Sequence, residues 1–243
     1  MSGPPFHIKA RPEDVAPRVV VAGDPARVRQ VADLLEEARL VNENRGFLTY
    51  TGYYGGERVT VATHGIGGPS AAIVFEELTM LGAKVMVRLG TCGGLVEGLR
   101  KGDVVIAAGA SYPVGGNAIG MYCPGACMAT APHPEVTHSL MEAARARGLK
   151  FLLGPVVSSD AFYAEDPGFV KRWSGVGMVA VEMECAALFA LGWMKGFKAG
   201  ALLVVSDSLV HEEESALAGA EELKEAVDRA AKVVLDALAK IEV

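Results

Sequence analysis

The chain has 243 residues, 51% of them hydrophobic, and it carries 23 Lys and Arg against 29 Asp and Glu. This hydrophobic content is ample for one sizeable core, and no linker divides the sequence. We therefore expect a single domain over residues 1–243. A net charge of −6 excludes a general binder of nucleic acid or of anionic membranes, because such proteins need a basic surface.

The N-terminus and the cysteines bear on localisation and on metal binding. The first residues, MSGPP, lack the charged leader and apolar core of a signal peptide, and no apolar run reaches the ~18 residues of a membrane span. We expect a cytoplasmic protein. The four cysteines lack the spacing of a zinc site, so no metal is expected. Cys123 and Cys127 leave a disulfide open, within or between subunits, although such bonds are rare inside cells.

The first predicted strand, residues 18–22, ends in a turn that opens a helix. Gly23, Asp24 and Pro25 form this turn, and a glycine here lets the backbone come close to a ligand. The following helix N-terminus favours an anion. One glycine is a weak signal, and the pattern taken alone is more typical of an ordinary turn.

A hairpin is predicted from residues 48–54 and 58–63, which alternate between apolar and polar side chains. Arg45 precedes it and, taken alone, is a solvated loop cation. Glycines follow the hairpin and open a helix over residues 71–81, but they lack the lysine and spacing of a phosphate-binding P-loop. We expect a tight turn near the site there, with His64 as a structural neighbour.

Residues 85–94 predict a buried strand with an arginine inside it. Buried Arg88 needs an anionic partner, and no acidic partner lies nearby in the sequence. A bound phosphate is therefore attractive, while an internal salt bridge remains the alternative.

The middle of the chain contains further strands and one clear helix. Strands are predicted over residues 104–107 and 151–157, and a helix over residues 134–148. The segment between residues 112 and 131 is irregular, and loops of this length are often functional. Phe162 and Tyr163 follow the second strand, and such an aromatic pair is usually part of a core.

Two carboxylates stand where a strand over residues 179–181 runs into a helix. Glu182 and Glu184 suit the positive end of that helix, or they line a ligand site at the carboxyl end of the strand. The last strand, residues 198–205, ends in Ser206 and Asp207, which usually cap or turn. An amphipathic helix follows over residues 220–240. Strands alternating with helices predict a single α/β domain.

Several of these motifs together resemble one family. Gly-Asp-Pro-x-Arg at 23–27, Arg-x-Gly-Thr at 88–91 and Val-Glu-Met-Glu at 181–184 are similar to motifs of the nucleoside phosphorylase-I family, which includes purine nucleoside and uridine phosphorylases. Residues 42–47 and 158–166 resemble most closely its archaeal-type methylthioadenosine and purine nucleoside phosphorylases. The resemblance implies a single-domain mixed α/β fold with a partly barrel-like central sheet flanked by helices.

The resemblance also implies roles for individual residues. Asp207 would be the general acid that protonates N7 of the leaving purine. Phosphate would be bound by Gly23, Arg27, Arg45, Arg88 and Thr91. The nucleoside would contact His7, Phe162, Glu182, Met183, Glu184 and Ser206, with Glu184 accepting from the ribose hydroxyls. His7 and Arg45 would reach the site of a neighbouring subunit.

The implied activity is phosphorolysis of purine nucleosides to free base and ribose 1-phosphate, with no metal or organic cofactor and in a homohexamer built as a trimer of dimers. A uridine phosphorylase is the first alternative, but Ala164, Glu165 and Asp166 stand where its Gln and Arg base readers are expected. A nucleosidase would use water instead of phosphate, and a non-catalytic nucleoside-binding module is a third possibility. The sequence departs from bacterial hexameric relatives beyond Asp207, where residues 211–214 replace an assisting arginine.

Overall fold

The computed structural model describes residues 4–164 and 166–243. Its strands are β1 (Arg18–Ala22), β2 (Glu36–Asn42), β3 (Thr49–Tyr54), β4 (Glu57–Thr63), β5 (Val85–Gly94), β6 (Val104–Ser111), β7 (Leu152–Ser158), β8 (Ala180–Glu182) and β9 (Lys198–Ser208). Its α-helices are α1 (Pro25–Ala32), α2 (Gly68–Met80), α3 (Ile119–Tyr122), α4 (Pro134–Ala146), α5 (Phe169–Gly175), α6 (Cys185–Lys195) and α7 (Ala220–Lys240). Short 3₁₀ helices cover Pro12–Asp14, Asn44–Gly46, Phe162–Ala164 and Glu212–Glu214.

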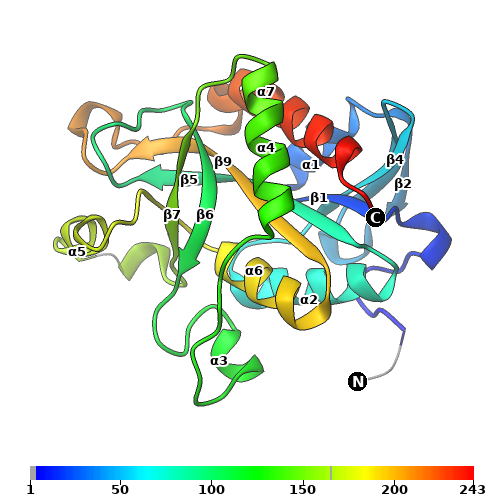
Figure 1. The fold of residues 1–243 in the computed structure, drawn as a ribbon, viewed down its shortest axis with the longest axis horizontal. Coiled ribbons are helices and arrows are strands. Elements are labelled where there is room, and N and C mark those ends of the chain that lie inside the picture. Colours follow the sequence, from blue (N-terminus) through cyan, green and yellow to red (C-terminus); the bar gives the residue numbers. More distant parts are fainter. Residues whose placement is uncertain (1–3, 165) are drawn as a thin grey trace.

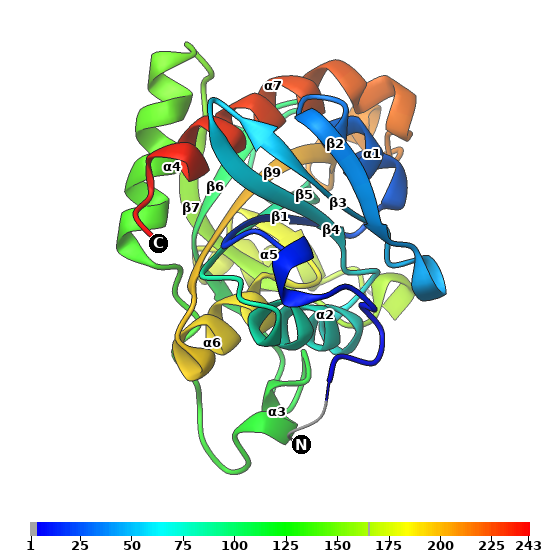
Figure 2. The same cartoon turned by 90° about the vertical axis from the view of Figure 1, so that its right-hand side faces the viewer.

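A mixed sheet closes partly into a barrel. Within the described residues the strand order is β2-β3-β4-β1-β5-β8-β7-β6-β9, and a further pairing of β5 with β9 closes the last five strands into a ring. The strands β2, β3 and β4 lie side by side and extend the sheet beyond this ring (Figure 2). The predicted mixed α/β fold with a partly barrel-like sheet is confirmed.

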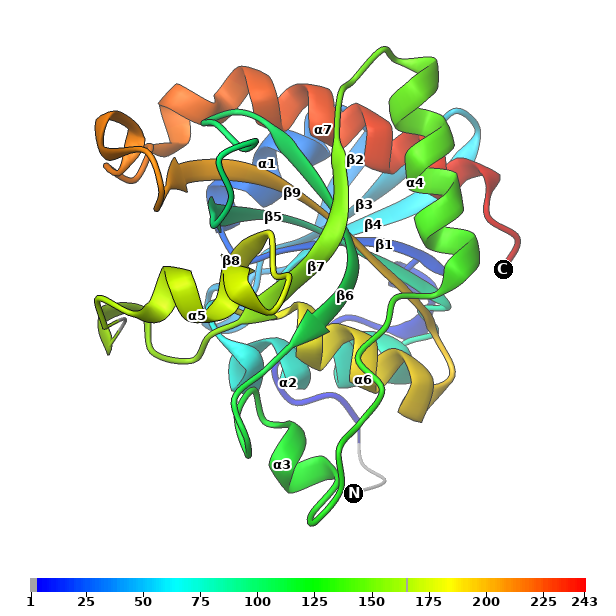
Figure 3. The same cartoon turned by 60° about the vertical axis from the view of Figure 1, so that its left-hand side comes forward.

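Helices cover the sheet on two sides (Figures 1 and 3). α1, α4 and α7 lie on one side, and α2 and α6 lie on the other. β1 shows why both sides are apolar: Val19 and Val21 belong to the hydrophobic cluster beneath α2 and α6, whereas Val20 and Ala22 belong to the cluster beneath α1 and α7. A strand buried on both faces reads as a continuous apolar run, as it does here.

The predicted strands and long helices are confirmed with small changes at their ends. The hairpin of β3 and β4 and the final helix α7 lie where the sequence predicts them. β9 extends three residues further than predicted and includes Asp207. The sequence predicts neither β2, α3 nor α5. β2 is largely exposed at the edge of the sheet and carries no alternating pattern, so the signal for a strand is absent there.

Candidate functional site

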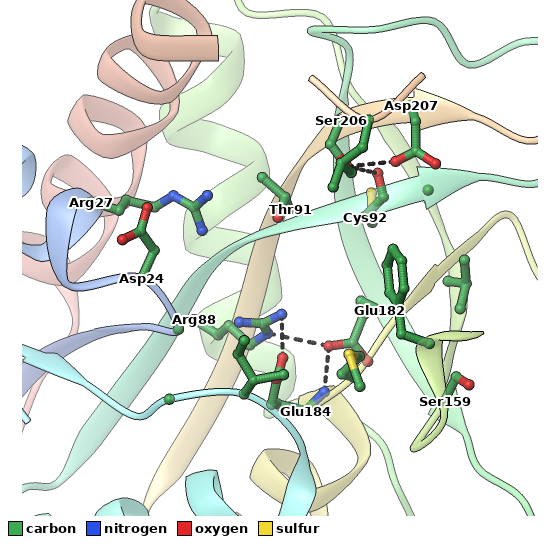
Figure 4. A pocket seen from close by; sticks show the side chains of 18 of the residues that line it. Asp24, Arg27, Arg88, Thr91, Cys92, Ser159, Glu182, Glu184, Ser206 and Asp207 are labelled. Carbon is green, nitrogen blue, oxygen red and sulfur yellow. Dashed lines mark hydrogen bonds and ion pairs between the residues drawn. The ribbon is translucent and has the colours of Figure 1, made fainter. Parts of the chain in front are cut away.

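A pocket of about 700 Å³ opens at the carboxyl ends of β1, β5, β8 and β9. Parallel sheets bind their ligands at this edge. Of the predicted site residues all but two line it: Gly23, Arg27, Arg88, Thr91, Phe162, Glu182, Met183, Glu184, Ser206 and Asp207. Residues from opposite ends of the sequence thus meet in one cavity (Figure 4).

Arg88 projects from β5 into the floor of the pocket and pairs with two carboxylates. Its Nη2 lies 2.6 Å from an oxygen of Glu184, and its Nε donates to Glu182 over 3.2 Å. Burial disfavours the charge of Arg88, but Glu184 and Glu182 outweigh burial and raise the pKa of the guanidinium. The internal salt bridge that the sequence left as the alternative is therefore present. Glu182 ends β8 and Glu184 follows it, and β8 pairs with β5 only in the folded sheet.

The carboxylate of Glu182 accepts hydrogen bonds from several groups of the protein. Besides Arg88, its carboxylate accepts from the Ser158 hydroxyl and from the backbone N–H groups of Glu184, at 2.7 Å, and Cys185, at 2.9 and 3.1 Å. These amides open α6, so Glu182 stabilises the start of that helix as its position in the sequence suggested. A carboxylate with this many donors is held rigidly and has little acceptor capacity left for a ligand.

Glu184 faces the pocket with both oxygens engaged. One oxygen accepts from the backbone N–H of Gly67 over 2.6 Å, and the other contacts Arg88. Burial and, more weakly, the neighbouring charge of Glu182 raise the pKa of Glu184 despite the attraction of Arg88. Glu182 and Glu184 thus both form ion pairs with the guanidinium of Arg88.

Arg27 differs from Arg88 because no carboxylate among the described residues forms an ion pair with it. Its side chain comes from α1, is half-buried and points towards Thr91 across the pocket (Figure 4). Burial and the charge of Arg88 lower the pKa of Arg27 despite the attraction of Asp24 and Glu184. Two guanidinium groups that repel each other thus line one side of the pocket, a place where a bound anion is stabilised.

Asp207 lies at the opposite side of the pocket, near the end of β9 (Figure 4). Burial raises its pKa, while a 2.7 Å hydrogen bond from the Ser206 hydroxyl and the charge of Lys101 oppose that shift. A carboxyl group with a raised pKa keeps its proton to higher pH, which suits a proton donor.

Comparison with known proteins identifies the family. Residues 17–240 match the family model of the phosphorylase superfamily. A guanosine phosphorylase from Halorubrum lacusprofundi is 35% identical over 236 residues, which cover 96% of this chain and 97% of the relative. The chain belongs to the phosphorylase superfamily.

Solved structures of superfamily members share the fold over nearly the whole chain. The purine nucleoside phosphorylase of Toxoplasma gondii, in complex with immucillin-H, matches with a TM-score of 0.90 and 32% identity, covering 98% of this chain and 97% of the other. The uridine phosphorylase of Vibrio fischeri matches with a TM-score of 0.87 and 26% identity, covering 99% of each chain.

His7 and Arg45 lie outside the pocket of this phosphorylase chain. The ring Nδ1 of His7 lies 2.7 Å from Glu77, whose carboxylate also accepts from the backbone N–H groups of Phe6, His7 and Ile8. Arg45 is exposed and has a left-handed backbone, with φ of 56°, in the turn after β2. A single chain does not bring either residue to its own site, so their predicted reach into a neighbour stays a prediction.

The pocket also contains apolar residues that the sequence analysis did not single out. They are Ile66, Cys92, Val181, Leu209 and Leu217. Ile66 could have been noticed in the sequence, because it is a large apolar residue between two glycines of a turn. Its side chain is 77% exposed in the structure. The others come from buried strands or from the segment after β9, where nothing in the pattern separates a pocket wall from a core.

Two other sequence expectations concern metals and disulfides. Among the described residues there is no group of three or more His, Cys, Asp or Glu placed to hold a metal ion. Cys123 and Cys127 are free thiols in the structure. In the part of the chain that the structure describes, no helix is long and apolar enough to cross a membrane.

Proposed function

We propose that this chain catalyses the phosphorolysis of purine nucleosides, giving the free base and ribose 1-phosphate. The observation that carries the proposal is the pair of Arg27 and Arg88, two guanidinium groups facing one pocket whose far side holds the protonatable Asp207. The names of the Halorubrum and Toxoplasma relatives, a guanosine and a purine nucleoside phosphorylase, support this substrate class.

Phosphate binds on the arginine side of the pocket. Arg27 supplies a guanidinium that forms no ion pair with a carboxylate of the described residues, and Arg88 has more N–H groups than its two carboxylate partners occupy. Thr91 adds a hydroxyl, and Gly23 adds a backbone contact. A glycine is needed at position 23, because a side chain there would meet the carbonyl oxygen of Gly65 at 3.0 Å. Charge-assisted hydrogen bonds of this kind contribute about 1.5–3 kcal/mol each.

The ribose lies above Met183 and beside Glu184. A carboxylate has acceptor sites for two hydroxyl donors, and the flexible thioether of Met183 fits the irregular underside of a sugar. Glu182 supports Met183 and Glu184 indirectly, because its carboxylate accepts hydrogen bonds from Arg88 and from the backbone N–H of Glu184. Its role is therefore support for the nucleoside contacts.

Groups on both sides of the pocket take part in bond cleavage. A phosphate oxygen attacks C1′ while the glycosidic bond to the base breaks, through a transition state like an oxocarbenium ion. The base leaves with the electron pair of that bond, and Asp207 donates its proton to N7 of the purine. Ser206 orients the Asp207 carboxyl group, and Phe162, which is 52% exposed, packs against the base. No metal or organic cofactor takes part in these steps.

We also propose an oligomeric state and a cellular location for the protein. His7 and Arg45 complete the site of a neighbouring subunit in a homohexamer, where Arg45 adds a third cation to the phosphate site. The protein acts in the cytoplasm. The exposed position of Arg45, away from its own pocket, supports the exchange between subunits.

A substrate panel tests the proposed function. Guanosine, inosine, adenosine, 5′-methylthioadenosine and uridine are incubated with the enzyme, with and without orthophosphate, and released base is measured. Release of purine bases only in the presence of orthophosphate is expected. Uridine turnover above that of every purine nucleoside, as the Vibrio neighbour would favour, contradicts the substrate class. Base release without phosphate contradicts the reaction.

A further inference from the structure

His64 lies directly behind the phosphate side of the pocket and contacts Arg88. Its Nε2 is 3.0 Å from Nη1 of Arg88, and both side chains are buried. Arg88 donates from Nε to Glu182 and from Nη2 to Glu184, and it also interacts with the Cys185 side chain. His64 is the partner at Nη1. A guanidinium has five N–H groups, more than Glu182, Glu184, Cys185 and His64 need with one hydrogen bond each.

The contact requires a neutral imidazole. A guanidinium can only donate hydrogen bonds, so Nε2 of His64 must accept, and the ring proton must be on Nδ1. Burial and the charge of Arg88 lower the pKa of His64 well below its ordinary value, which agrees with this state. Nδ1 has no well-formed hydrogen bond within the described part of the chain, so the contact of Nε2 with Arg88 is the main polar contact of the ring there.

The position of the ring is fixed by the elements around it. The His64 backbone N–H donates to Ala22 at the end of β1 over 2.9 Å, and the Ser70 hydroxyl donates to its carbonyl over 2.7 Å. The ring meets Phe75 edge to face, with centroids 5.6 Å apart. A side chain at Gly23 would stand 3.4 Å from the ring carbon Cε1. His64 thus links the glycine turn after β1 to Arg88 on β5.

We propose that His64 is a positioning residue whose neutral Nε2 fixes the rotation of the Arg88 guanidinium, so that the N–H side of this group that is left open faces the phosphate. The inference rests on the proposed function and goes beyond it, because His64 does not line the pocket. Without this acceptor, one N–H of a buried cation loses its partner, and the guanidinium turns to recover it. Glu182 and Glu184 alone hold only the other two nitrogens.

Three substitutions separate positioning from mere folding. His64→Gln places an amide oxygen near the position of Nε2, His64→Asn places one nearer the backbone, and His64→Leu removes the acceptor. For each variant, binding of inorganic phosphate is measured by calorimetry, and KM values are determined separately for phosphate and for the nucleoside. Circular dichroism and melting temperatures report folding.

We expect His64→Leu and His64→Asn to weaken phosphate binding by about 10- to 100-fold, the range for a hydrogen bond to a charged group. The KM for the nucleoside should change much less, and His64→Gln should restore most of the phosphate affinity. Wild-type phosphate affinity in a folded His64→Leu or His64→Asn variant overturns the role of His64. Equal losses in the Gln and Asn variants also overturn it. A wild-type enzyme that binds no phosphate overturns the proposed function as well.

Discussion

At the scale of single residues, Arg88 stabilises two carboxylates that share its charge. Glu182 and Glu184 are both buried, and the opposing charge that they contact in the described chain is Arg88. Breaking a buried pair by removing one partner costs about 3–5 kcal/mol, because an uncompensated charge is left behind. Arg88 therefore belongs to the stability of the fold as well as to the proposed phosphate site.

Replacing Arg88 by Met tests this double role. The free energy of unfolding should fall by about 3–5 kcal/mol near neutral pH, measured by urea denaturation. The deficit relative to wild type should narrow as the pH approaches the ordinary Glu pKa of about 4.3, because protonation removes the unpaired charges.

Arg100 offers a matched control for that substitution. It also contacts two carboxylates, Glu213 and Glu214, but its side chain is 48% exposed. Arg100→Met should change the free energy of unfolding much less than Arg88→Met, because water and salt screen exposed ion pairs. Equal losses in the Arg88 and Arg100 variants would contradict the importance of burial.

Asp207→Asn should separate activity from stability. The variant keeps an oxygen that accepts from Ser206 but has no proton to give, so kcat should fall about a hundred- to ten-thousand-fold. Because burial raises the pKa of Asp207, the folded chain binds this proton more tightly than the unfolded chain. Wild-type stability is therefore lost as the pH rises from about 3.9, the ordinary Asp value, through the raised pKa.

The Asp207→Asn variant does not lose stability as the pH rises, because the Asn side chain does not titrate. Its melting temperature should equal or exceed that of wild type near neutral pH, and the difference should disappear below about pH 3.9. Calorimetric melts across this range, together with turnover assays, check both parts. An Asn variant with full turnover would contradict the role of Asp207 as the acid.

At the scale of elements, Asn117 ties the loop after β6 to both sides of the pocket. This residue is fully buried and has a left-handed φ of 54°. Its amide nitrogen donates to Asp160 and to the carbonyl of Met183, and its amide oxygen accepts from the Ala187 N–H in α6. The loop carrying Phe162 is thus connected to the turn that carries Glu184.

Asn117→Ala should lower the free energy of unfolding by about 3 kcal/mol, because buried partners lose their hydrogen bonds. It should also raise the KM for the nucleoside more than the KM for phosphate. Asn117→Gly separates the two causes: glycine tolerates a left-handed backbone, so it should be less destabilising than Ala by about 1 kcal/mol. Equal stabilities of the Gly and Ala variants would contradict a contribution from backbone strain.

Elements with strong apolar patterns were predictable from the sequence, and their contacts were not. β1, β5 and α7 have continuous or periodic apolar residues and lie where predicted. The closure of β5 on β9 depends on pairings far apart in the chain, which no local pattern records. For the same reason the residues lining the pocket were identified by motif, whereas the ion pairs of Arg88 with Glu182 and Glu184 became visible only in the folded sheet.

At the scale of the whole molecule, we predict that two chains contribute to each site. Arg45 is in an exposed turn between β2 and β3, two neighbouring strands at one edge of the sheet (Figure 2). If this arginine serves a neighbour, two inactive variants can complement each other. Arg45→Ala and Asp207→Asn are suited to this test because one residue lies outside the pocket and the other lines it.

Co-expression of the Arg45→Ala and Asp207→Asn chains should restore activity. In a mixed pair one site is intact and the other lacks both groups, so random mixing gives about a quarter of wild-type turnover. The separately purified variants, mixed without subunit exchange, are the control. Activity no higher than the mean of the two parents would contradict the sharing of sites between subunits.

The central claim is that phosphate itself is the nucleophile that takes the ribose from the purine base. Guanosine or inosine is incubated with the enzyme and with orthophosphate labelled with oxygen-18, and the sugar product is analysed by mass spectrometry. We expect ribose 1-phosphate that keeps every labelled oxygen, because a phosphate oxygen forms the new bond to C1′ and no P–O bond breaks. Free ribose as the first product, formed at a rate independent of orthophosphate, would contradict it.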